Sequence, residues 1–240
     1  MMKCLILAGG FGKRVSQLTG GRAKALLEYR GRPLISHIVD RIPRNIEILV
    51  TTNKKFEADL LGWQKSVNRK VELLVEGSWS ECQKLGALES INYWAQIKQI
   101  NEDLLVIAGD NYFEFDINRF ISAYDGVNTL VAVYETGAPE KARDFGVIKM
   151  KERKIIEFTE KPVRPDSSLI ATACYIFPPR VLRLCIDYCL KGKIDSLGRF
   201  IAYLVEEDEV DGFFFTEKWF DIGSEIQMPG AWNFPNNAQE

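Results

Sequence analysis

Apolar and polar positions alternate in blocks along the first half of the chain. Short apolar runs are separated by segments in which apolar residues recur every three or four positions. The runs predict buried strands at residues 3–8, 46–51, 71–75 and 104–108, and the periodic segments predict helices at 33–42, 54–65 and 85–95. Such alternation is typical of a mostly parallel sheet with helices on both faces.

The second half of the chain is richer in strand-like segments. Strands are predicted at 129–135, 146–150, 154–158, 171–177 and 212–215, and helices at 179–190 and 196–205. No linker, repeat or low-complexity tract divides the chain. We therefore predict one mixed α/β domain over residues 1–228, followed by a C-terminal tail at 229–240.

Composition excludes several classes of function. The 240 residues are 46% hydrophobic and 27% charged, with a net charge of −2 and a pI near 5.7. A chain with this charge has no general electrostatic attraction for nucleic acid or for an anionic membrane. Neither a membrane-spanning run nor a signal peptide is recognisable, which predicts a cytoplasmic protein. Five cysteines without a Cys-x-x-Cys pair argue against a disulfide framework or structural zinc. A single histidine, His37, argues against histidine-based catalysis.

The first predicted strand runs directly into a glycine-rich turn. Glycines can bring successive backbone N–H groups close to phosphate oxygens, and nearby cations can neutralise the remaining charge. The sequence therefore predicts a phosphate-binding loop with Arg14 and Lys24 as its cations. The residues expected to line the nucleotide here are Leu7, Ala8, Gly9, Gly10 and Gly12.

Two well-known phosphate loops fit this turn poorly. A P-loop requires a hydroxyl residue directly after Gly-Lys, whereas Arg14 follows Lys13 here. The dinucleotide fingerprint requires a third glycine where this chain has Val15. On the glycines alone, an ordinary strand-to-loop turn remains an alternative.

Two aspartates follow or interrupt apolar segments far apart in the chain. Asp110 lies two residues after the end of the strand at 104–108, where ligands bind in open α/β sheets. Asp221 lies within Trp219-Phe220-Asp221-Ile222-Gly223. Mg²⁺ is often bound by one or two carboxylates together with substrate phosphates, so this pair would suffice. The alternatives are a strand-ending turn for Asp110 and a helix cap for Asp221.

A third group of polar residues lies between these aspartates. Lys161, held before a proline, offers a point charge to a phosphate monoester, and Glu160 could accept hydrogen bonds from sugar hydroxyls. As an isolated feature this pair would be a solvated ion pair of little energetic weight. Gly146, Thr172 and Tyr175 flank the pair in the sequence, in an order that resembles the sugar-phosphate site of the sugar-1-phosphate nucleotidylyltransferases.

Taken in order, these motifs resemble the sugar-1-phosphate nucleotidylyltransferases, also called nucleotide-sugar pyrophosphorylases. The resemblance extends from about residue 3 to 226 and is greatest with compact glucose-1-phosphate thymidylyltransferase-like members. It implies a Rossmann-like three-layer sandwich of the nucleotide-diphospho-sugar transferase type, with a mixed, mainly parallel sheet and a small β-rich sugar-binding part. It also implies that Arg14 and Lys24 hold the nucleoside triphosphate, Asp110 and Asp221 hold the catalytic Mg²⁺, and Lys161 contacts the sugar phosphate.

The chain departs from the family pattern at several positions. Gln17 and Ala23 stand where prolines are common, and Ala173 replaces a usual glycine. In the segment expected to contact the base, Gln83 stands in place of the first glycine, while Gly86 fits. Both are predicted nucleotide-binding residues, and the choice of base stays open.

The resemblance implies in-line attack of a sugar 1-phosphate on the α-phosphorus of a nucleoside triphosphate, with glucose 1-phosphate and dTTP or UTP as the expected pair. A cytidylyltransferase acting on phosphocholine or another phosphomonoester is an alternative. A non-catalytic nucleotide-sugar-binding regulator and a nicotinamide-dependent dehydrogenase are further alternatives. The expected partners are small molecules rather than nucleic acid or membrane, and the aromatic residues leave apolar surface for a homo-oligomer.

Overall fold

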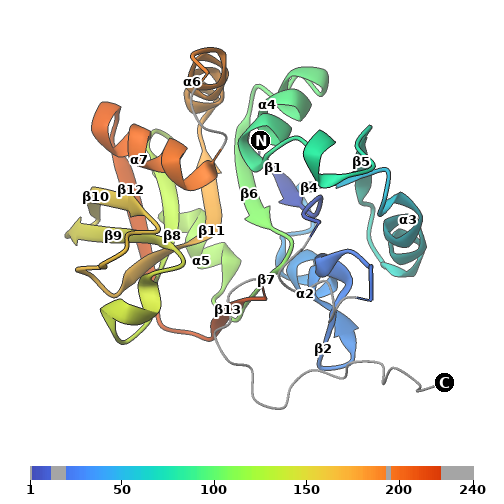
Figure 1. Ribbon diagram of the computed structural model, residues 1–240, viewed down its shortest axis with the longest axis horizontal. Coiled ribbons are helices and arrows are strands. Elements are labelled where there is room, and N and C mark those ends of the chain that lie inside the picture. The colour runs from blue at the N-terminus through green and yellow to red at the C-terminus, as the bar shows by residue number, and fades with distance from the viewer. Residues whose placement is uncertain (1, 12–19, 193–195, 223–240) are drawn as a thin grey trace.

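The computed structural model describes residues 2–11, 20–192 and 196–222, and a nine-stranded sheet forms its centre (Figure 1). The strand order is β5-β4-β1-β6-β11-β8-β12-β10-β9. These strands are β1 (Met2–Leu7), β4 (Glu47–Asn53), β5 (Glu72–Glu76), β6 (Asp103–Ala108), β8 (Thr129–Glu135), β9 (Gly146–Lys151), β10 (Lys154–Glu160), β11 (Leu169–Phe177) and β12 (Val210–Phe215). Short pairs lie outside this sheet: β2 (Glu28–Tyr29) with β3 (Arg32–Pro33), and β7 (Asn111–Phe113) with β13 (Trp219–Asp221).

The sheet changes character along its width. Strands β5, β4, β1 and β6 are parallel, as the alternating first half of the chain predicts. Strand β11 then runs antiparallel to both β6 and β8, whereas β8 and β12 are parallel. Strands β9 and β10 form an antiparallel hairpin, and β9 also pairs with β11, which makes this edge the β-rich part of the domain.

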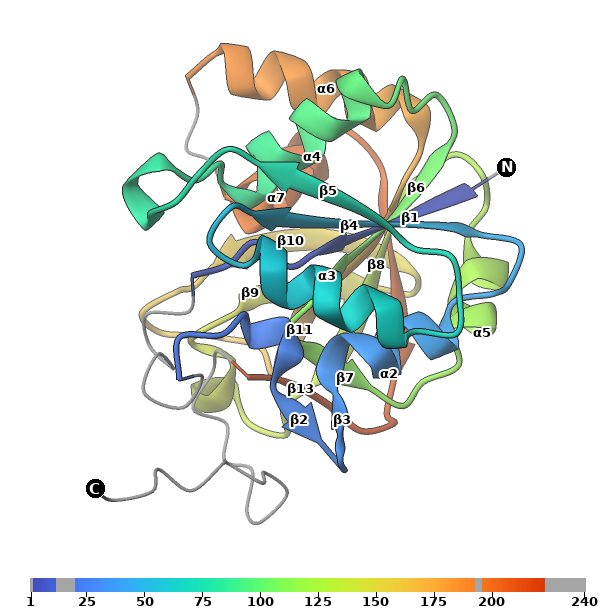
Figure 2. The ribbon, with the colours of Figure 1, turned by 90° about the vertical axis from the view of Figure 1, so that its right-hand side faces the viewer.

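Helices cover both faces of the sheet, as the turned view shows (Figure 2). One face carries α2 (Leu34–Arg41), α3 (Glu57–Ser66) and α5 (Ile117–Ala123), and the other carries α4 (Ala87–Ile97), α6 (Pro179–Leu190) and α7 (Leu197–Glu207). Alternate residues of β1 divide between the two cores: Cys4 and Ile6 lie in one, and Leu5 in the other. Three layers result, which confirms the predicted fold.

The differences from the predicted elements are small and have local causes. Helix α3 begins at Glu57 rather than residue 54, because the Phe56 N–H bonds to the carbonyl of Asn53 in a turn. Helix α5 was not predicted from the sequence. In the structure it begins after the N-cap residue Asp116, whose side chain accepts a hydrogen bond from the Asn118 N–H. Strands β7 and β13 have three residues each, too few for a periodic pattern. The predicted tail at 229–240 lies outside the described residues.

Three short 3₁₀ segments complete the description: η2 (Lys24–Leu26), η3 (Glu81–Gln83) and η4 (Pro139–Ala142). All five cysteines lie in the described residues, and none of them forms a disulfide. Among the described residues, helices of the length and apolar character needed to cross a bilayer are absent.

Candidate active site

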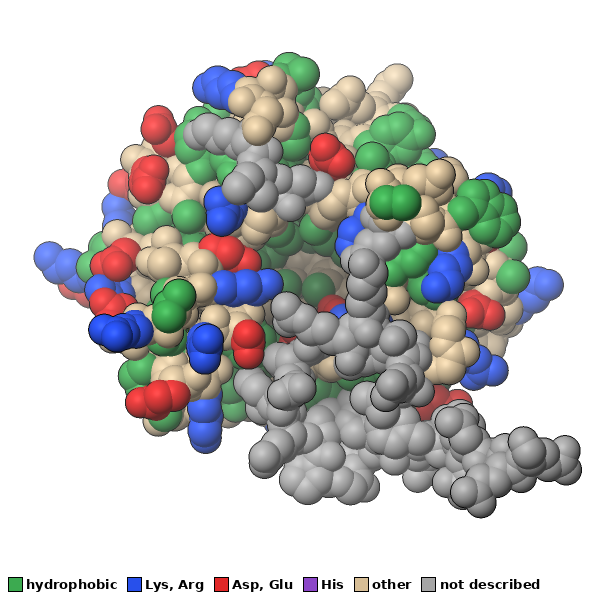
Figure 3. Space-filling view, in the orientation of Figure 1, with side chains coloured by type: hydrophobic (Ala, Val, Ile, Leu, Met, Phe, Trp, Pro, Cys, Tyr) green, Lys and Arg blue, Asp and Glu red, His purple; other side chains and the backbone are tan. Residues whose placement is uncertain are grey.

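A cavity of about 400 Å³ lies where residues from both halves of the chain meet. The surface is hollowed at this place, with charged side chains at the rim (Figure 3). Its volume falls within the range typical of small-molecule sites. The first half contributes Leu7, Gly9, Gly10, Thr51, Glu76, Lys84, Leu85, Gly86, Ala87, Ser90 and Ala108; the second contributes Asp144, Phe145, Gly146, Phe158, Glu160, Lys161, Ala171, Ala173, Tyr175, Ser196, Leu197, Gly198 and Asp221.

The glycine-rich turn begins at this cavity. Leu7, Gly9 and Gly10 line it, while Ala8 is buried beneath and donates its N–H to the Thr51 carbonyl at 3.0 Å. The Asn53 amide donates to the Gly9 carbonyl at 2.8 Å and so holds the start of the turn. The predicted residues Gly12 and Arg14 lie outside the described residues.

The end of β6 places Asp110 beside this turn. The Gly109 N–H donates to the Leu7 carbonyl at 2.9 Å, and a Cβ at Gly109 would come within 2.9 Å of that same oxygen. Only glycine therefore allows the two strand ends to approach so closely. Asp110 Oδ2 then forms an ion pair with Lys24 Nζ at 3.3 Å, so the structure brings these two predicted residues together.

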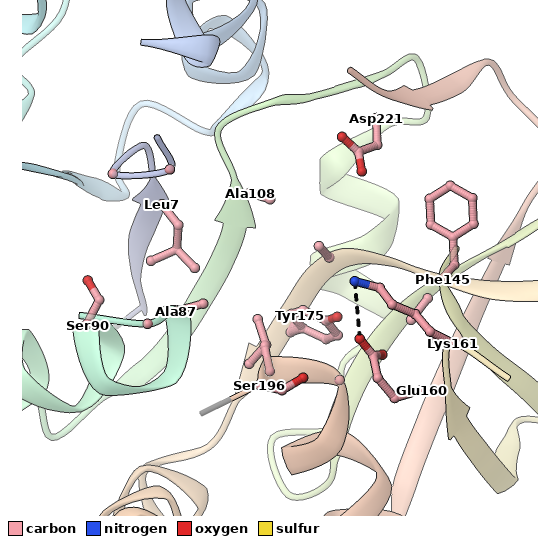
Figure 4. Close-up of a pocket in the computed structure, with 18 of the residues that line it drawn as sticks. Leu7, Ala87, Ser90, Ala108, Phe145, Glu160, Lys161, Tyr175, Ser196 and Asp221 are labelled. Carbon is pink, nitrogen blue, oxygen red and sulfur yellow. Dashed lines mark ion pairs between the residues drawn. The ribbon is translucent and has the colours of Figure 1, made fainter. Parts of the chain in front are cut away.

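Asp221 reaches the same region through the short ladder of β13 with β7. Asp221 is paired with Asn111, and the Ile222 N–H donates to the Asp110 carbonyl at 3.1 Å. The Asp221 side chain lines the cavity (Figure 4). The Asn111 amide in turn donates to the Thr172 carbonyl at 2.7 Å, which ties β7 to β11. The two predicted aspartates are thus neighbours.

Two carboxylates fit a divalent cation that keeps other ligands. Among the described residues, His, Cys, Asp and Glu side chains form no group of three or more able to hold a metal. Of the described residues, Asp110 and Asp221 are the pair predicted for such a site, and oxygen atoms of substrate and water would complete the shell. That donor set matches Mg²⁺, which is usually held by one or two carboxylates plus substrate phosphates.

The opposite wall carries Glu160 and Lys161 at the end of β10. Their Oε1 and Nζ atoms are 3.7 Å apart, and both side chains line the cavity (Figure 4). Lys161 has a φ of 48°, and its N–H donates to the Phe145 carbonyl at 2.9 Å. Burial raises the pKa of Glu160 above its ordinary value, while the Lys161 and Arg199 charges oppose that shift. This carboxyl therefore binds a proton more readily than an exposed glutamate does.

Gly146 begins β9 opposite Glu160 in the β9–β10 ladder and lines the cavity. A Cβ at this position would come within 2.2 Å of the buried Phe158 ring. Glycine is therefore required by packing, and its backbone is left open to the cavity, as a sugar-contacting position needs.

Gly198, in the first turn of α7, determines where the Glu160 carboxylate can lie. A Cβ at Gly198 would be 1.9 Å from Glu160 Oε2. We expect Gly198→Ala to push this carboxylate out of place. The KM for the sugar 1-phosphate that the sequence predicts as substrate should then rise about tenfold, as expected for the loss of roughly one hydrogen bond. Gly62→Ala is the matched control, since a Cβ there meets nothing within 4 Å. Steady-state kinetics with an unchanged KM in Gly198→Ala would contradict this role.

Strand β11 contains a residue in an unfavourable backbone conformation. Ala173 has a φ of 53°, within an irregularity of the β11–β8 ladder between Ala171 and Tyr175. Ala173 and Tyr175 line the cavity. Thr172 does not line it; this side chain is buried and donates from Oγ1 to the Ala132 carbonyl at 3.0 Å. The hydroxyl is therefore already bonded within the fold, and the contact of Thr172 with the sugar phosphate stays a prediction.

We expect Ala173→Gly to raise the free energy of unfolding by about 0.5–1 kcal/mol. The left-handed conformation costs a residue with a Cβ about 1–2 kcal/mol, and the greater flexibility of glycine in the unfolded chain offsets part of that gain. Ala171→Gly, two residues earlier in the strand, should instead lower it by about 0.5–1 kcal/mol. Urea denaturation of both variants is the measurement, and equal destabilisation would contradict the prediction.

Of the two residues predicted to contact the base, Gly86 lines the cavity and Gln83 does not. Gly86 precedes α4 as its N-cap residue and lines the cavity. Gln83 is exposed in η3, where its side-chain oxygen accepts from Ser80 Oγ at 3.1 Å, and it lies outside the cavity. Sequence reasoning missed Glu76 and Ser90. Glu76 directly follows the predicted strand at 71–75, and Asp110 likewise lies just beyond a predicted strand, so the same positional rule could have found Glu76.

Comparisons with known proteins agree with this architecture. A family model described as nucleotidyl transferase matches residues 3–228. Bifunctional protein GlmU of Methanocaldococcus jannaschii is 29% identical over 92% of this chain and 51% of the relative. A putative mannose-1-phosphate guanyltransferase of Sulfolobus acidocaldarius is 25% identical over 93% of this chain and 60% of the relative. The chain thus spans about half to three fifths of the length of these curated relatives.

Solved structures share the fold. A putative glucose-1-phosphate thymidylyltransferase from Bacillus anthracis has a TM-score of 0.79 at 24% identity, covering 94% of this chain and 92% of that chain. A UDP-glucose pyrophosphorylase complexed with UDP-glucose has a TM-score of 0.76 at 21% identity, covering 93% and 94%. Because the family model covers nearly the whole sequence, the chain belongs to the nucleotidyl transferase family.

Proposed function

We propose that this protein is a sugar-phosphate nucleotidylyltransferase, which converts a nucleoside triphosphate and a sugar 1-phosphate into a nucleotide-sugar and pyrophosphate. The observation that supports it most is one cavity with two unlike walls. The glycine-rich end of β1 lies on one wall, Glu160 and Lys161 lie on the other, and Asp221 also lines the cavity (Figure 4). Two phosphorylated substrates could meet there with their phosphates facing each other.

The reaction needs little chemistry from side chains. A phosphate oxygen of the sugar 1-phosphate attacks the α-phosphorus, the bond from that phosphorus to the bridging oxygen breaks, and pyrophosphate leaves with the electron pair. The nucleophile is already an anion, so no general base is required. Catalysis then consists of positioning and of stabilising charge.

The described residues divide this work between them. Backbone N–H groups at Gly9 and Gly10 would approach the triphosphate, and Lys24 would neutralise its inner phosphates. Lys161 would hold the incoming phosphate, and Glu160 would accept hydrogen bonds from sugar hydroxyls. Arg14, proposed for the leaving end of the triphosphate, rests on the sequence resemblance alone.

Asp110 and Asp221 would hold Mg²⁺, and the bound ion would stabilise negative charge on the triphosphate. The Lys24–Asp110 ion pair already places a cation beside this carboxylate. We therefore propose that the aspartates are the protein's metal ligands and that Lys24 turns from Asp110 to phosphate when the nucleotide binds.

The identity of the substrates is a finer proposal. The resemblance to compact thymidylyltransferases favours glucose 1-phosphate with dTTP or UTP. The names of the relatives also include a mannose-1-phosphate guanyltransferase, so sugar and base need to be varied independently. We keep the expectation of a cytoplasmic enzyme with small-molecule partners as part of this proposal, with a homo-oligomer left to direct measurement.

The test is release of pyrophosphate with Mg²⁺ across five nucleoside triphosphates and the 1-phosphates of glucose, mannose, galactose and N-acetylglucosamine. Phosphocholine is included as a competing phosphomonoester. Release that requires one sugar phosphate supports the proposal. Turnover of phosphocholine alone would favour a cytidylyltransferase, and inactivity with tight nucleotide-sugar binding would favour a regulatory protein.

A further inference from the structure

A buried carboxylate that the proposed mechanism does not use lies in the nucleotide half of the cavity. Glu76 is the last residue of β5, is 6% exposed and lines the cavity together with Thr51 and Gly86. Ser90 Oγ donates a hydrogen bond to Glu76 Oε1 at 2.5 Å. Ser90 projects from the start of α4 near Ala87 (Figure 4). A carboxylate is costly to bury, and one that lines a ligand cavity presents acceptor oxygens to whatever binds there.

The position of Glu76 suits the base of a nucleotide rather than its phosphates. The parallel strands β1, β4 and β5 are neighbours, so the ends of β1 and β5 are about 10 Å apart at the usual strand spacing. A nucleotide whose phosphates lie at Gly9 and Gly10 can extend across the strand ends toward Glu76. Leu7 and Leu85 line this stretch and offer apolar contact to a ring face.

The chemistry of the carboxylate favours one base. An ionised glutamate has two acceptor oxygens and no donor. Guanine presents two adjacent donors on its Watson–Crick edge, the N1–H and the 2-amino group. Adenine and cytosine each place a ring-nitrogen acceptor beside their amino donor, and uracil and thymine place carbonyls on both sides of a single N–H. Of the five bases, guanine alone offers two adjacent donors to a carboxylate without opposing an acceptor to it.

We infer that Glu76, positioned by Ser90, selects guanine, so that the nucleotide used by this protein is GTP. Lys84 also lines the cavity and carries donors of the kind that guanine O6 accepts. This inference rests on the proposed function and replaces the dTTP or UTP expected from the overall resemblance. It makes Glu76 the specificity-determining residue for the base.

A purely structural role for Glu76 has different consequences. If the Ser90 bond served only to fasten α4 to β5, replacing Glu76 would weaken the binding of every nucleotide alike. A residue that contacts the base instead changes the ranking of nucleotides. The test is therefore a comparison among bases within each protein rather than a single loss of activity.

The experiment is calorimetric titration of the whole chain with GTP, ITP, ATP, CTP, UTP and dTTP in Mg²⁺, without any sugar phosphate. ITP differs from GTP only in lacking the 2-amino group. We expect GTP to bind at least tenfold more tightly than ITP and about 100-fold more tightly than UTP or dTTP. This comparison needs only the unaltered protein.

Glu76→Gln is the variant, because it keeps the shape and replaces one acceptor with a donor. We expect it to weaken GTP binding about 100-fold, to reduce the difference between GTP and ITP, and to leave UTP binding equal or tighter. Glu72→Gln, at the other end of the same strand, is the matched control and should bind like the unaltered protein.

Equal binding of GTP and ITP, a preference for another base, or a uniform loss for all nucleotides in Glu76→Gln would each overturn the inference. The absence of any nucleotide binding would overturn both proposals. Failure of the proposed function can be distinguished from failure of this inference. If the protein bound guanine nucleotides selectively through Glu76 but turned over no sugar 1-phosphate, only the proposed function would be wrong.

Discussion

Asp110→Asn is expected to lower kcat/KM about 10²–10³-fold and to raise the Mg²⁺ concentration that gives half-maximal rate. Asparagine keeps the size of the side chain and removes the negative charge that would hold the cation. Loss of one charge-stabilising group in a preorganised site typically costs two to three orders of magnitude in rate. Asp110 is also the partner of Lys24 at 3.3 Å, so the substitution releases this lysine as well.

The matched control is Asp103→Asn at the beginning of the same strand. Asp103 Oδ1 accepts a hydrogen bond from the Tyr124 hydroxyl at 2.9 Å, and an asparagine oxygen can accept the same bond. Its Mg²⁺ titration curve should match that of the unaltered protein. A normal rate and a normal Mg²⁺ curve in Asp110→Asn would remove Asp110 from the proposed metal site.

The parallel half of the fold could be predicted from local patterns, because short, mainly apolar runs alternate there with segments of helical periodicity. The order of the remaining strands could not. Strand β11 is adjacent to both β6 and β8, and β12 is inserted between β8 and β10. These pairings join segments far apart in sequence, and hydrophobic periodicity carries no information about which strand lies beside which.

The candidate site shows the same division. Asp110 could be placed from its position after a strand, since ligands bind beyond the carboxyl ends of strands in such sheets. Asp221 becomes its neighbour through the three-residue pairing of β13 with β7. Local sequence patterns do not predict that pairing. The need for glycine at 198 depends entirely on the Glu160 carboxylate of another element, so it emerges only from the folded structure.

The conformation of Lys161 could be predicted from the sequence in part, and the structure supplies the rest. The proline after it was visible in the sequence, and proline disfavours the helical conformation in the residue that precedes it. The structure adds a φ of 48° and the hydrogen bond to the Phe145 carbonyl. A non-glycine residue held in this region is uncommon and is often found at functional sites, which supports a role in holding substrate.

Lys161→Ala is therefore expected to raise KM for the sugar 1-phosphate about 10–100-fold while changing KM for the nucleoside triphosphate less than threefold. A hydrogen bond between charged groups contributes about 1.5–3 kcal/mol, and only the sugar phosphate loses that bond here. Lys161→Arg keeps the charge but changes its shape, so it should recover part of the affinity. Initial rates with each substrate varied in turn measure the two constants separately.

Lys149→Ala is the control for loss of a lysine from the same β-rich edge. Lys149 lies on β9 and forms ion pairs with Glu157 at 2.9 Å and Asp166 at 2.6 Å, away from the cavity. Its removal should leave both KM values unchanged, because an exposed surface pair contributes little and touches no substrate. If Lys161→Ala raised both KM values equally, the lysine would support the whole cavity. If only the nucleotide constant rose, the two walls of the cavity would have to exchange their proposed substrates.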